Sequence, residues 1–430
     1  MCWTGIVLPR LRLLQVGDIH LPSAADAKAF VDMKDEKFPV NLGTLISRQP
    51  IKSVFLRMYE VLRTTNIDAI LFMGDFTDLG NLAGYEACAN YIKSSLQIGA
   101  KGLHAAVQVG IVPGNHDIDR QLAIGSSLTS KFVPLNSALN KLGLPALPVD
   151  VPRQISIDKT GASLKVYLLN SCWGCGEKEY IPEVFRAPIS DAIDAALKGA
   201  DAQKARKLYY DRQLDTPALS GDTITALINA IHAASKATLP VVVGHHNLLP
   251  QRIARLAPYT ELVNSGSLRA SLGELKRPVL FLHGHIHDDP IEVLQQPSEA
   301  PLVIISAPEA VSGFNIVEII YARTSVPLVC NVIPYRFDGS GILRPGETIR
   351  VSLIGRRARS DHRTFSAFYG QLLSAGRCFW QDVVRIAARH LEGVDDETLS
   401  EHLELLYADG SITIENYDEA PANWIIRAEI

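Results

Sequence analysis

Short apolar runs recur along the chain, and five of them end in a polar loop that contains glycine. These five runs lie at residues 11–16, 67–73, 107–112, 239–243 and 278–282. Helical stretches at 51–65 and 85–96 separate the first three runs. Continuous apolar strands that alternate with helices are typical of an α/β fold with buried, largely parallel strands. Ligands of such sheets bind outside the carboxyl ends of the strands, where the five polar loops fall.

Three later runs, at 302–306, 315–321 and 328–335, predict a second set of strands. We therefore expect two sheets packed face to face, with helices on the outside. A longer polar and helical stretch lies between residues 171 and 240. This stretch is either a cap over the polar loops or a set of surface helices.

The chain changes character after about residue 336. A loop with glycines and a proline is followed by a strand-like run at 348–354. Apolar residues at helical spacing then predict helices at 380–390 and 396–408, and an extended hairpin follows from residue 411. We expect a smaller C-terminal α+β module with a winged-helix-like outline. The predicted domain limits are 1–336 and 337–430.

The composition is that of an ordinary globular protein. Of the 430 residues, 47% are hydrophobic and 20% are charged, so the chain can bury a sizeable core. The net charge of −4 gives no general attraction to nucleic acid or anionic membranes. No apolar run approaches the roughly 18 residues that a membrane-spanning helix needs, and the first residues lack the pattern of a secretory signal. We expect no membrane partner and a cytoplasmic location.

Two of the six cysteines, Cys172 and Cys175, form a Cys-Trp-Gly-Cys pair. A structural zinc site usually needs a second such pair, and the sequence has none. A redox role of the thioredoxin type would need its own βα context. We therefore interpret the pair as two thiols on a loop, and the scattered remaining cysteines as packing residues.

Side chains that bind divalent metals gather in the five polar loops. Each is weak evidence alone, because a Gly-Asp pair is usually a turn and a lone buried histidine usually belongs to the core. Their order carries the argument, since every strand delivers a ligand-type residue where the sheet should end, and seven of the twelve histidines lie in these loops. Hard oxygen donors and imidazoles on rigid strand ends suit a metal pair that binds phosphate. The candidate ligands are Asp18, His20, Asp75, Asn115, His245, His285 and His287.

Taken together, the five loop motifs resemble those of the calcineurin-like metallophosphoesterase superfamily. They read Asp-x-His, Gly-Asp-x-x-Asp-x-Gly, Gly-Asn-His-Asp, His-His and Gly-His-x-His, at residues 18–20, 74–80, 114–117, 245–246 and 284–287. The motif sequences are most similar to those of the class III cyclic-nucleotide phosphodiesterase branch. The resemblance covers about residues 10–335 and implies a four-layer α/β/β/α sandwich. The fourth motif departs from the common His-His-Pro-Pro, because Asn247 and Leu248 follow the histidines.

The resemblance also implies a role for each motif residue. One metal would be held by Asp18, His20, Asp75 and His287. The second would be held by Asp75, Asn115, His245 and His285. His116 would contact the phosphate and protonate or stabilise the leaving group, and Asp117 would orient His116. Asp78 is expected to fix its loop, whereas His246 and His283 would either support the ligands or simply pack.

This site predicts a phosphoesterase that cleaves a diester or monoester of a small nucleotide-like substrate. Two divalent ions, of manganese, iron or zinc, would lower the pKa of a shared water, so that a metal-bound hydroxide attacks phosphorus in line. No protein nucleophile is needed, and the sequence has no Cys-x5-Arg, Gly-x-Ser-x-Gly or Walker A motif.

Two other functions remain open from the sequence. A nuclease of the Mre-eleven or SbcD type would need a basic groove, and the only candidate is the arginine cluster at 356–363, which we interpret as a solvated loop. A metal-binding platform subunit in a larger assembly is disfavoured by the presence of His116. Residues 391–430 carry eleven acidic residues and a single arginine, so nucleic acid is a less favoured partner. We expect residues 337–430 to contact a protein partner or a second copy of the chain.

Overall fold

The computed structural model describes most of the sandwich and of the C-terminal module. The described residues are 9–20, 61–62, 64–77, 82–95, 107–119, 122–124, 129–175, 183–196, 198, 216–250, 261–287, 290–295, 300–338, 342–355, 366–391 and 393–429. Most of the helix expected at 51–65, the second-motif residue Asp78 and the arginine cluster at 356–363 lie outside them.

The first sheet has seven strands in the order β12-β11-β10-β1-β2-β3, with β13 also paired to β11. β1, β2 and β3 are parallel, whereas β10 runs antiparallel to its neighbours β1 and β11. The strands are β1 (Arg10–Val16), β2 (Ala69–Phe72), β3 (Gln108–Ile111), β10 (Gly313–Tyr321), β11 (Pro327–Phe337), β12 (Leu343–Pro345) and β13 (Ile349–Ser352). The sheet therefore continues past residue 336, and the two-domain limit at that point stays a prediction.

The second sheet has six strands in the order β4-β5-β6-β7-β9-β8. Its four central strands are parallel, and the two edge strands are antiparallel to their neighbours. The strands are β4 (Arg153–Lys159), β5 (Ala162–Leu168), β6 (Leu239–Val243), β7 (Val279–His283), β8 (Ile291–Leu294) and β9 (Leu302–Ser306). β6 and β9 coincide with two predicted runs, because every residue in them is buried.

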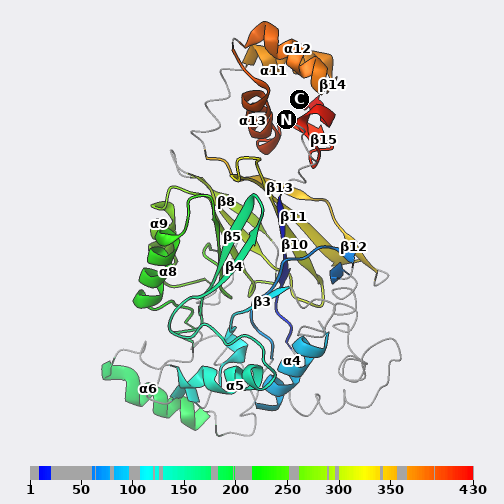
Figure 1. Cartoon of the computed structure of the whole chain (residues 1–430). Helices are drawn as coiled ribbons and strands as arrows, with labels where there is room; N and C mark the ends of the chain where they lie inside the picture. Colours follow the sequence, from blue (N-terminus) through cyan, green and yellow to red (C-terminus); the bar gives the residue numbers. More distant parts are fainter. Residues whose placement is uncertain are drawn as a thin grey trace.

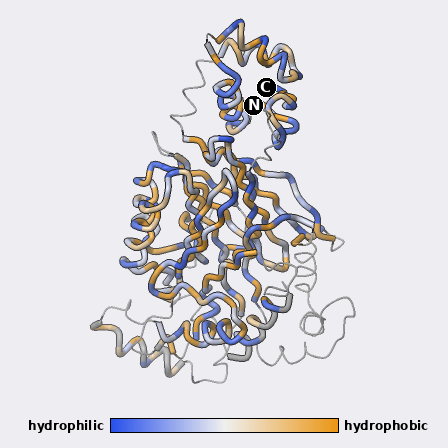
Figure 2. The backbone as a smooth tube through the Cα atoms, in the orientation of Figure 1, coloured by the Kyte–Doolittle hydropathy of each residue, from blue (hydrophilic) through white to orange (hydrophobic). Residues whose placement is uncertain are grey.

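Helices cover the outer face of each sheet. α4 (Leu82–Ser95) and α5 (Val133–Lys141) share a core with β1, β2 and β3, whereas α8 (Gly221–Ala233) and α9 (Ser265–Gly273) pack on the second sheet. A third cluster, including Leu13, Val166 and Val241, fills the space between the sheets. Figures 1 and 2 show the layers and the hydrophobic stretches that run along the central strands. The four-layer α/β/β/α prediction is confirmed.

The stretch between residues 171 and 240 contributes α6 (Glu183–Ala196) and α8. α8 belongs to the outer layer, because Leu227 and Ile231 pack with Phe281 of β7. Short 3-10 turns occur at η1 (Asn115–Asp117), η2 (Leu122–Ile124), η3 (Ser130–Phe132) and η7 (Pro421–Asn423). None of the described helices is long and apolar enough to cross a membrane.

The C-terminal module has the order helix, strand, helix, helix and hairpin, which is the outline of a winged helix. Its elements are α11 (Ser366–Ala375), β14 (Arg377–Phe379), α12 (Trp380–His390), α13 (Asp396–Ala408), β15 (Ile412–Glu415) and β16 (Ile425–Ala428). The predicted helices at 380–390 and 396–408 are confirmed. Their apolar faces join a core with Ile320, Leu328 and Val329, so the module packs against β10 and β11.

The module meets the sandwich at the end opposite the polar loops (Figure 1). Arg10, at the start of β1, forms an ion pair with Asp418 of the module. The polar loop after β1 begins near Asp18, eight residues later, and at about 3.3 Å per residue this separation is about 25 Å. The described part of the module is therefore remote from the candidate ligands.

A buried carboxyl group lies where the module meets the sandwich. Glu404 is 1% exposed and accepts hydrogen bonds from the Arg323 backbone N–H at 3.3 Å and the Tyr417 hydroxyl at 3.1 Å. Burial raises the pKa of Glu404 to about 7, although Arg323 opposes the shift.

Candidate metal centre

The structure brings all seven candidate ligands to one edge of the sandwich. In the first sheet, the loop after β1 carries Asp18 and His20, the loop after β2 carries Asp75, and the loop after β3 carries Asn115. In the second sheet, the loop after β6 carries His245, and the loop after β7 carries His285 and His287. Because parallel strands of both sheets end here, side chains far apart in the sequence can converge on the same space.

One group of donors combines Asp18, His20 and His287, whose ligand atoms lie within 4.8 Å of one another. His287 Nε2 is 2.8 Å from Asp18 Oδ2 and 3.3 Å from His20 Nε2. The backbone N–H of His285 donates to both Asp18 oxygens, at 3.1 and 3.2 Å, and fixes that carboxylate. A carboxylate and two imidazoles at this spacing suit a transition metal or zinc.

A second group of donors surrounds His245. Its Nε2 lies 3.0 Å from Asn115 Oδ1 and 3.2 Å from Asp75 Oδ2. Its Nδ1 donates to the Met73 carbonyl at 2.7 Å. That backbone bond holds the ring so that Nε2 faces the donors, which is how metal-binding histidines are usually oriented.

The Asp75 carboxylate lies between the two groups. Its ligand oxygen is within 4.8 Å of those of Asp18 and His245, and also of those of His20 and His116. The backbone N–H of His116 donates to Asp75 Oδ1 at 2.8 Å. A carboxylate in this position can contact two ions at once.

Four candidate ligands have left-handed backbone conformations. The φ angles are 47° at His20, 51° at Asp75, 68° at His285 and 55° at His287. Each such residue costs of order 1–3 kcal/mol unless its surroundings compensate, and such residues cluster at functional sites. These strained backbone conformations therefore orient the four side chains toward the candidate site.

Motif glycines allow the loops to approach closely. A Cβ on Gly114 would lie 2.0 Å from Asp75 Oδ1, and one on Gly284 would lie 2.4 Å from Asp18 Oδ1. Any larger residue at either position would push a carboxylate out of place. The glycines of the third and fifth motifs are thus explained by packing.

Electrostatics also fit a bound cation. Asp18 and Asp75 are 1% and 2% exposed. Burial would raise their pKa values, but His245 and other nearby histidines lower both. Burial would likewise lower the pKa of His245, but Asp75 and Asp18 raise it to about 10. The two buried carboxylates are thus stabilised by nearby positive charge, here the protonated His245 ring. Divalent cations would supply that charge instead, and His245 would lose its proton when it binds one of them.

His285 is held in the neutral form that a metal needs. Burial, followed by the charge of His245, lowers the pKa of His285 to about 3. A neutral imidazole offers a lone pair to a cation. Together the oxygen and nitrogen donors fit two divalent ions of the kind predicted from the sequence.

Asp117 joins two of the loops. Its fully buried carboxylate accepts hydrogen bonds from the backbone N–H groups of Phe76 at 2.8 Å, Thr77 at 3.0 Å and Gly114 at 2.9 Å. Burial and the charge of Asp75 raise the pKa of Asp117 to about 7, against the effect of these amide donors. These contacts favour a positioning role for Asp117, and its predicted orientation of His116 stays a prediction.

His116 lies within the 3-10 turn η1. Its ring meets the ring of His20 edge-on, with centroids 4.9 Å apart. The side chain is thus at the candidate ligands, where a proton donor to a leaving group would have to be. Its catalytic role also stays a prediction.

One supporting residue gave no signal in the sequence. Ser171, after β5, accepts hydrogen bonds at its Oγ from the backbone N–H groups of His245 at 3.1 Å and His246 at 3.2 Å. An isolated serine at a strand end is too common to single out. His283 donates from Nδ1 to the Gly284 carbonyl at 3.0 Å, and burial lowers its pKa to about 4, which favours packing.

Comparison with known sequences decides the family. The sequence pattern of calcineurin-like phosphoesterases matches residues 11–289, which include every candidate ligand. The chain belongs to the calcineurin-like phosphoesterase family. It is accordingly a metal-dependent phosphohydrolase, and the family implies a dinuclear centre of divalent metal ions. The superfamily and enzyme predictions are confirmed.

Solved structures give distant likenesses to this calcineurin-like phosphoesterase. A dimetal phosphatase from Danio rerio is 13% identical, with a TM-score of 0.44 over 81% of this chain and 100% of that one. The purple acid phosphatase PPD1 of yellow lupin is 11% identical, with a TM-score of 0.46 over 81% and 55% of the two chains. A 5'-nucleotidase precursor from Thermus thermophilus is 11% identical, with a TM-score of 0.39 over 80% and 55%. No curated protein matches.

Proposed function

We propose that this phosphohydrolase cleaves a phosphodiester or phosphomonoester of a small nucleotide-like substrate with two divalent ions. The first ion would be bound by Asp18, His20, Asp75 and His287, and the second by Asp75, Asn115, His245 and His285. The observation that carries the proposal is the buried Asp75 carboxylate, which lies between the two groups of donors. Manganese, iron and zinc all suit these nitrogen and oxygen donors.

Two bound cations would supply charge neutralisation for the phosphate oxygens and would lower the pKa of a water molecule. The protein residues have separate tasks. Asp75 would bind both ions, and the bond from His245 to the Met73 carbonyl keeps that ligand ring in place. His116 would donate a proton to the leaving oxygen.

The class III cyclic-nucleotide phosphodiesterase branch remains our preferred subfamily. In place of the common Pro-Pro, Asn247 forms an isolated parallel bridge with Glu261, and its carbonyl accepts from the Leu262 N–H at 3.1 Å. This backbone contact occurs where the common motif has two prolines beside the ligands. We therefore expect a substrate shape different from that of proteins with the proline pair.

The proposal is tested by a substrate panel in the presence of manganese. The panel contains cyclic mononucleotides, dinucleotides, aryl mono- and diesters, and single- and double-stranded DNA and RNA. We expect hydrolysis of the small esters and none of the polymers. Preferred cleavage of DNA or RNA would favour the nuclease alternative, and failure to hydrolyse every ester in a metal-loaded, folded protein would favour the platform alternative.

Association through residues 337–430 is also part of the proposal. The apolar faces of α12 and α13 are used within the chain, so the contact surface must lie elsewhere. Phe379 is 56% exposed and Leu373 37% exposed on the outside of the module. Exposed apolar side chains support a protein contact, and the acidic residues 391–430 of the same module disfavour nucleic acid.

A further inference from the structure

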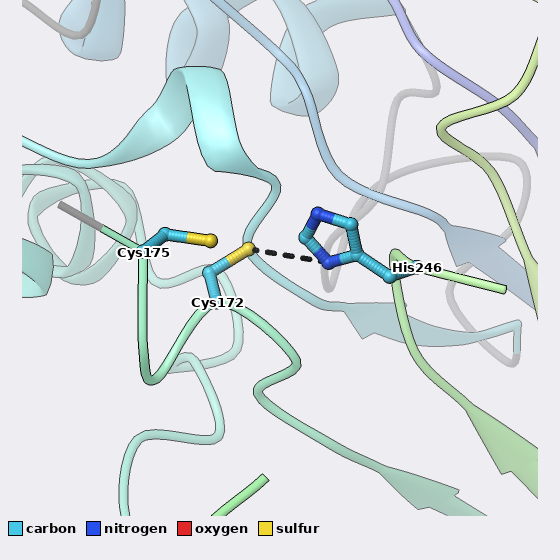
Figure 3. A group of neighbouring side chains, drawn as sticks. All are labelled: Cys172, Cys175 and His246. Carbon is cyan, nitrogen blue, oxygen red and sulfur yellow. Dashed lines mark hydrogen bonds between the residues drawn. The ribbon is translucent and has the colours of Figure 1, made fainter. Parts of the chain in front are cut away.

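A second set of metal-binding side chains lies beside the dinuclear centre. Cys172 and Cys175 come from the loop after β5, and His246 comes from the loop after the neighbouring parallel strand β6. Figure 3 shows the two thiols and the imidazole pointing toward one another. Their sulfur and nitrogen atoms all lie within 4.8 Å of one another.

The backbone already holds this group in shape. The Cys175 N–H donates to the Cys172 carbonyl at 3.0 Å and closes a tight turn. The Cys172 N–H donates to the Asn170 side chain at 3.0 Å, and Cys172 also forms an isolated bridge with Ala218. A donor pair that is fixed before a ligand arrives loses little conformational freedom on binding.

One sulfur–nitrogen distance in the group is close to that of a zinc site. Cys172 Sγ is 4.0 Å from His246 Nδ1. Tetrahedral zinc with ordinary bond lengths places sulfur and nitrogen about 3.6 Å apart. A contraction of about 0.4 Å would therefore bring the observed pair into a coordination sphere. Three protein ligands would leave one position for a water molecule.

A buried lysine holds the loop that carries the two cysteines. The Lys131 side chain is fully buried, and its ammonium donates to the carbonyls of Trp173 and Cys175, each at 2.7 Å. Burial raises the pKa of the Cys172 thiol well above its ordinary value, so a cation is needed to release the proton.

His246 is oriented for coordination through Nδ1. That nitrogen lies 2.9 Å from the Ser171 hydroxyl, whose oxygen already accepts two backbone N–H groups. Its Nε2 is buried and has no hydrogen-bond partner in the part of the chain that the structure describes. The proton therefore belongs on Nε2, because Nδ1 accepts from Ser171. Rotation of that hydroxyl would free the Nδ1 lone pair without moving the ring.

We propose that Cys172, Cys175 and His246 bind a third metal ion, of the thiophilic class represented by zinc. The ion would be independent of the two nitrogen- and oxygen-bound cations of the active site. It would hold the His246 ring in place, and that ring packs 4.5 Å from the ring of His285. The site thus gives the dinuclear centre a rigid support.

Cobalt(II) titration of the full-length, reduced protein tests the proposal. Thiolate ligands give Co²⁺ a charge-transfer absorption in the near ultraviolet that nitrogen and oxygen ligands do not give. Because the dinuclear centre also takes up Co²⁺, we expect this band to saturate by about three equivalents per chain, at the intensity of one thiolate-bound ion, and to disappear when zinc is added. The double variant Cys172→Ser/Cys175→Ser should lack the band, whereas the matched control Cys88→Ser, a buried cysteine of α4, should keep it.

A further variant separates this site from the proposed hydrolysis. Asp75→Asn impairs the dinuclear centre but should keep the thiolate band. If Asp75→Asn removes the band together with activity, the third ion is not independent and the proposal is overturned. A folded, reduced wild-type protein without the band would also overturn it.

Alkylation of the unmodified protein provides a second measurement if the double variant does not fold. Zinc should slow alkylation of Cys172 and Cys175, mapped by mass spectrometry, relative to Cys330 in the same sample. Equal protection of all three thiols, or none, would mean that zinc does not bind the pair.

Discussion

Gly114→Ala should displace the Asp75 carboxylate from its position between the two donor groups. The new Cβ would lie 2.0 Å from Asp75 Oδ1 and 2.3 Å from the Asp75 backbone nitrogen. Because real Cβ contacts below 3.0 Å are essentially never seen, one of the two loops must move by about 1 Å. A misplacement of about 1 Å in an active site can cost 10²-fold in rate. We therefore expect turnover to fall roughly 100-fold, with a stability loss of about 1–3 kcal/mol from overpacking.

The matched control is Gly221→Ala, at the first position of α8. A Cβ there meets nothing within 4 Å, so activity should be unchanged. Both variants are assayed with an aryl phosphodiester and manganese, after circular dichroism has confirmed folding. Calorimetric titration with manganese then separates lost metal affinity from lost turnover. Near wild-type turnover in folded Gly114→Ala would refute the close approach of the two loops, and with it the placement of Asp75.

Four further predictions concern the site and the module. Asp75→Asn keeps the shape of the side chain but removes the shared charge. It should lower both activity and metal content, measured by mass spectrometry, more than any other single ligand change. His116→Ala should keep the metals but slow hydrolysis by roughly 10²–10⁴-fold, and less for a nitrophenyl ester than for an alkyl ester, whose leaving group needs the proton. Glu404 has a pKa of about 7 in the folded protein, against an ordinary value of 4.5. Between these two pH values the folded chain binds more protons than the unfolded chain, so the free energy of unfolding falls as pH rises, by about 3 kcal/mol in all. Glu404→Gln should flatten this dependence and raise the melting temperature at about pH 8. Truncation after residue 336 removes β13 and uncovers Leu328 and Val329, and should lower the melting temperature or cause aggregation.

Each of these predictions has a contradicting result. Full metal content in Asp75→Asn would remove the shared-ligand role, and equal losses on both esters would limit His116 to phosphate binding. A melting temperature that falls by the same amount in the wild type and in Glu404→Gln between about pH 5 and pH 7 would show that other groups control it. A truncated protein as stable as the full chain would mean that the module is dispensable for the sandwich.

The elements that could be predicted from the sequence are those with an unambiguous hydrophobic pattern. β6 and β9 are buried throughout, and α12 and α13 have apolar positions at helical spacing. The hairpin of β4 and β5 escaped the prediction because β4 lies at a sheet edge with five of its seven residues exposed. In its sequence, Arg-Gln-Ile-Ser-Ile-Asp-Lys, only Ile155 and Ile157 face the core, and two apolar residues are too few to mark a strand.

The candidate ligands could be predicted because their motifs follow strand ends in order along the chain. Contacts between loops could not, since they depend on which strands are neighbours. The pairing of β5 with β6 brings His246 to Cys172, 74 residues away in the sequence. A sequence pattern of two cysteine pairs does not include a histidine on a neighbouring strand, so it gave no indication of this group. The same limit applies to Asp117, whose partners lie on the loop after β2.

The division of the donors between two sheets has a consequence for the order of folding. The carboxylate and amide oxygens belong to the first sheet, and three of the four candidate histidine ligands belong to the second. A folding intermediate with only one sheet therefore carries only part of either metal site, and tight binding must wait until the sheets dock. Since interactions that form after the transition state act on the unfolding rate, added metal should slow unfolding and leave the refolding rate nearly unchanged.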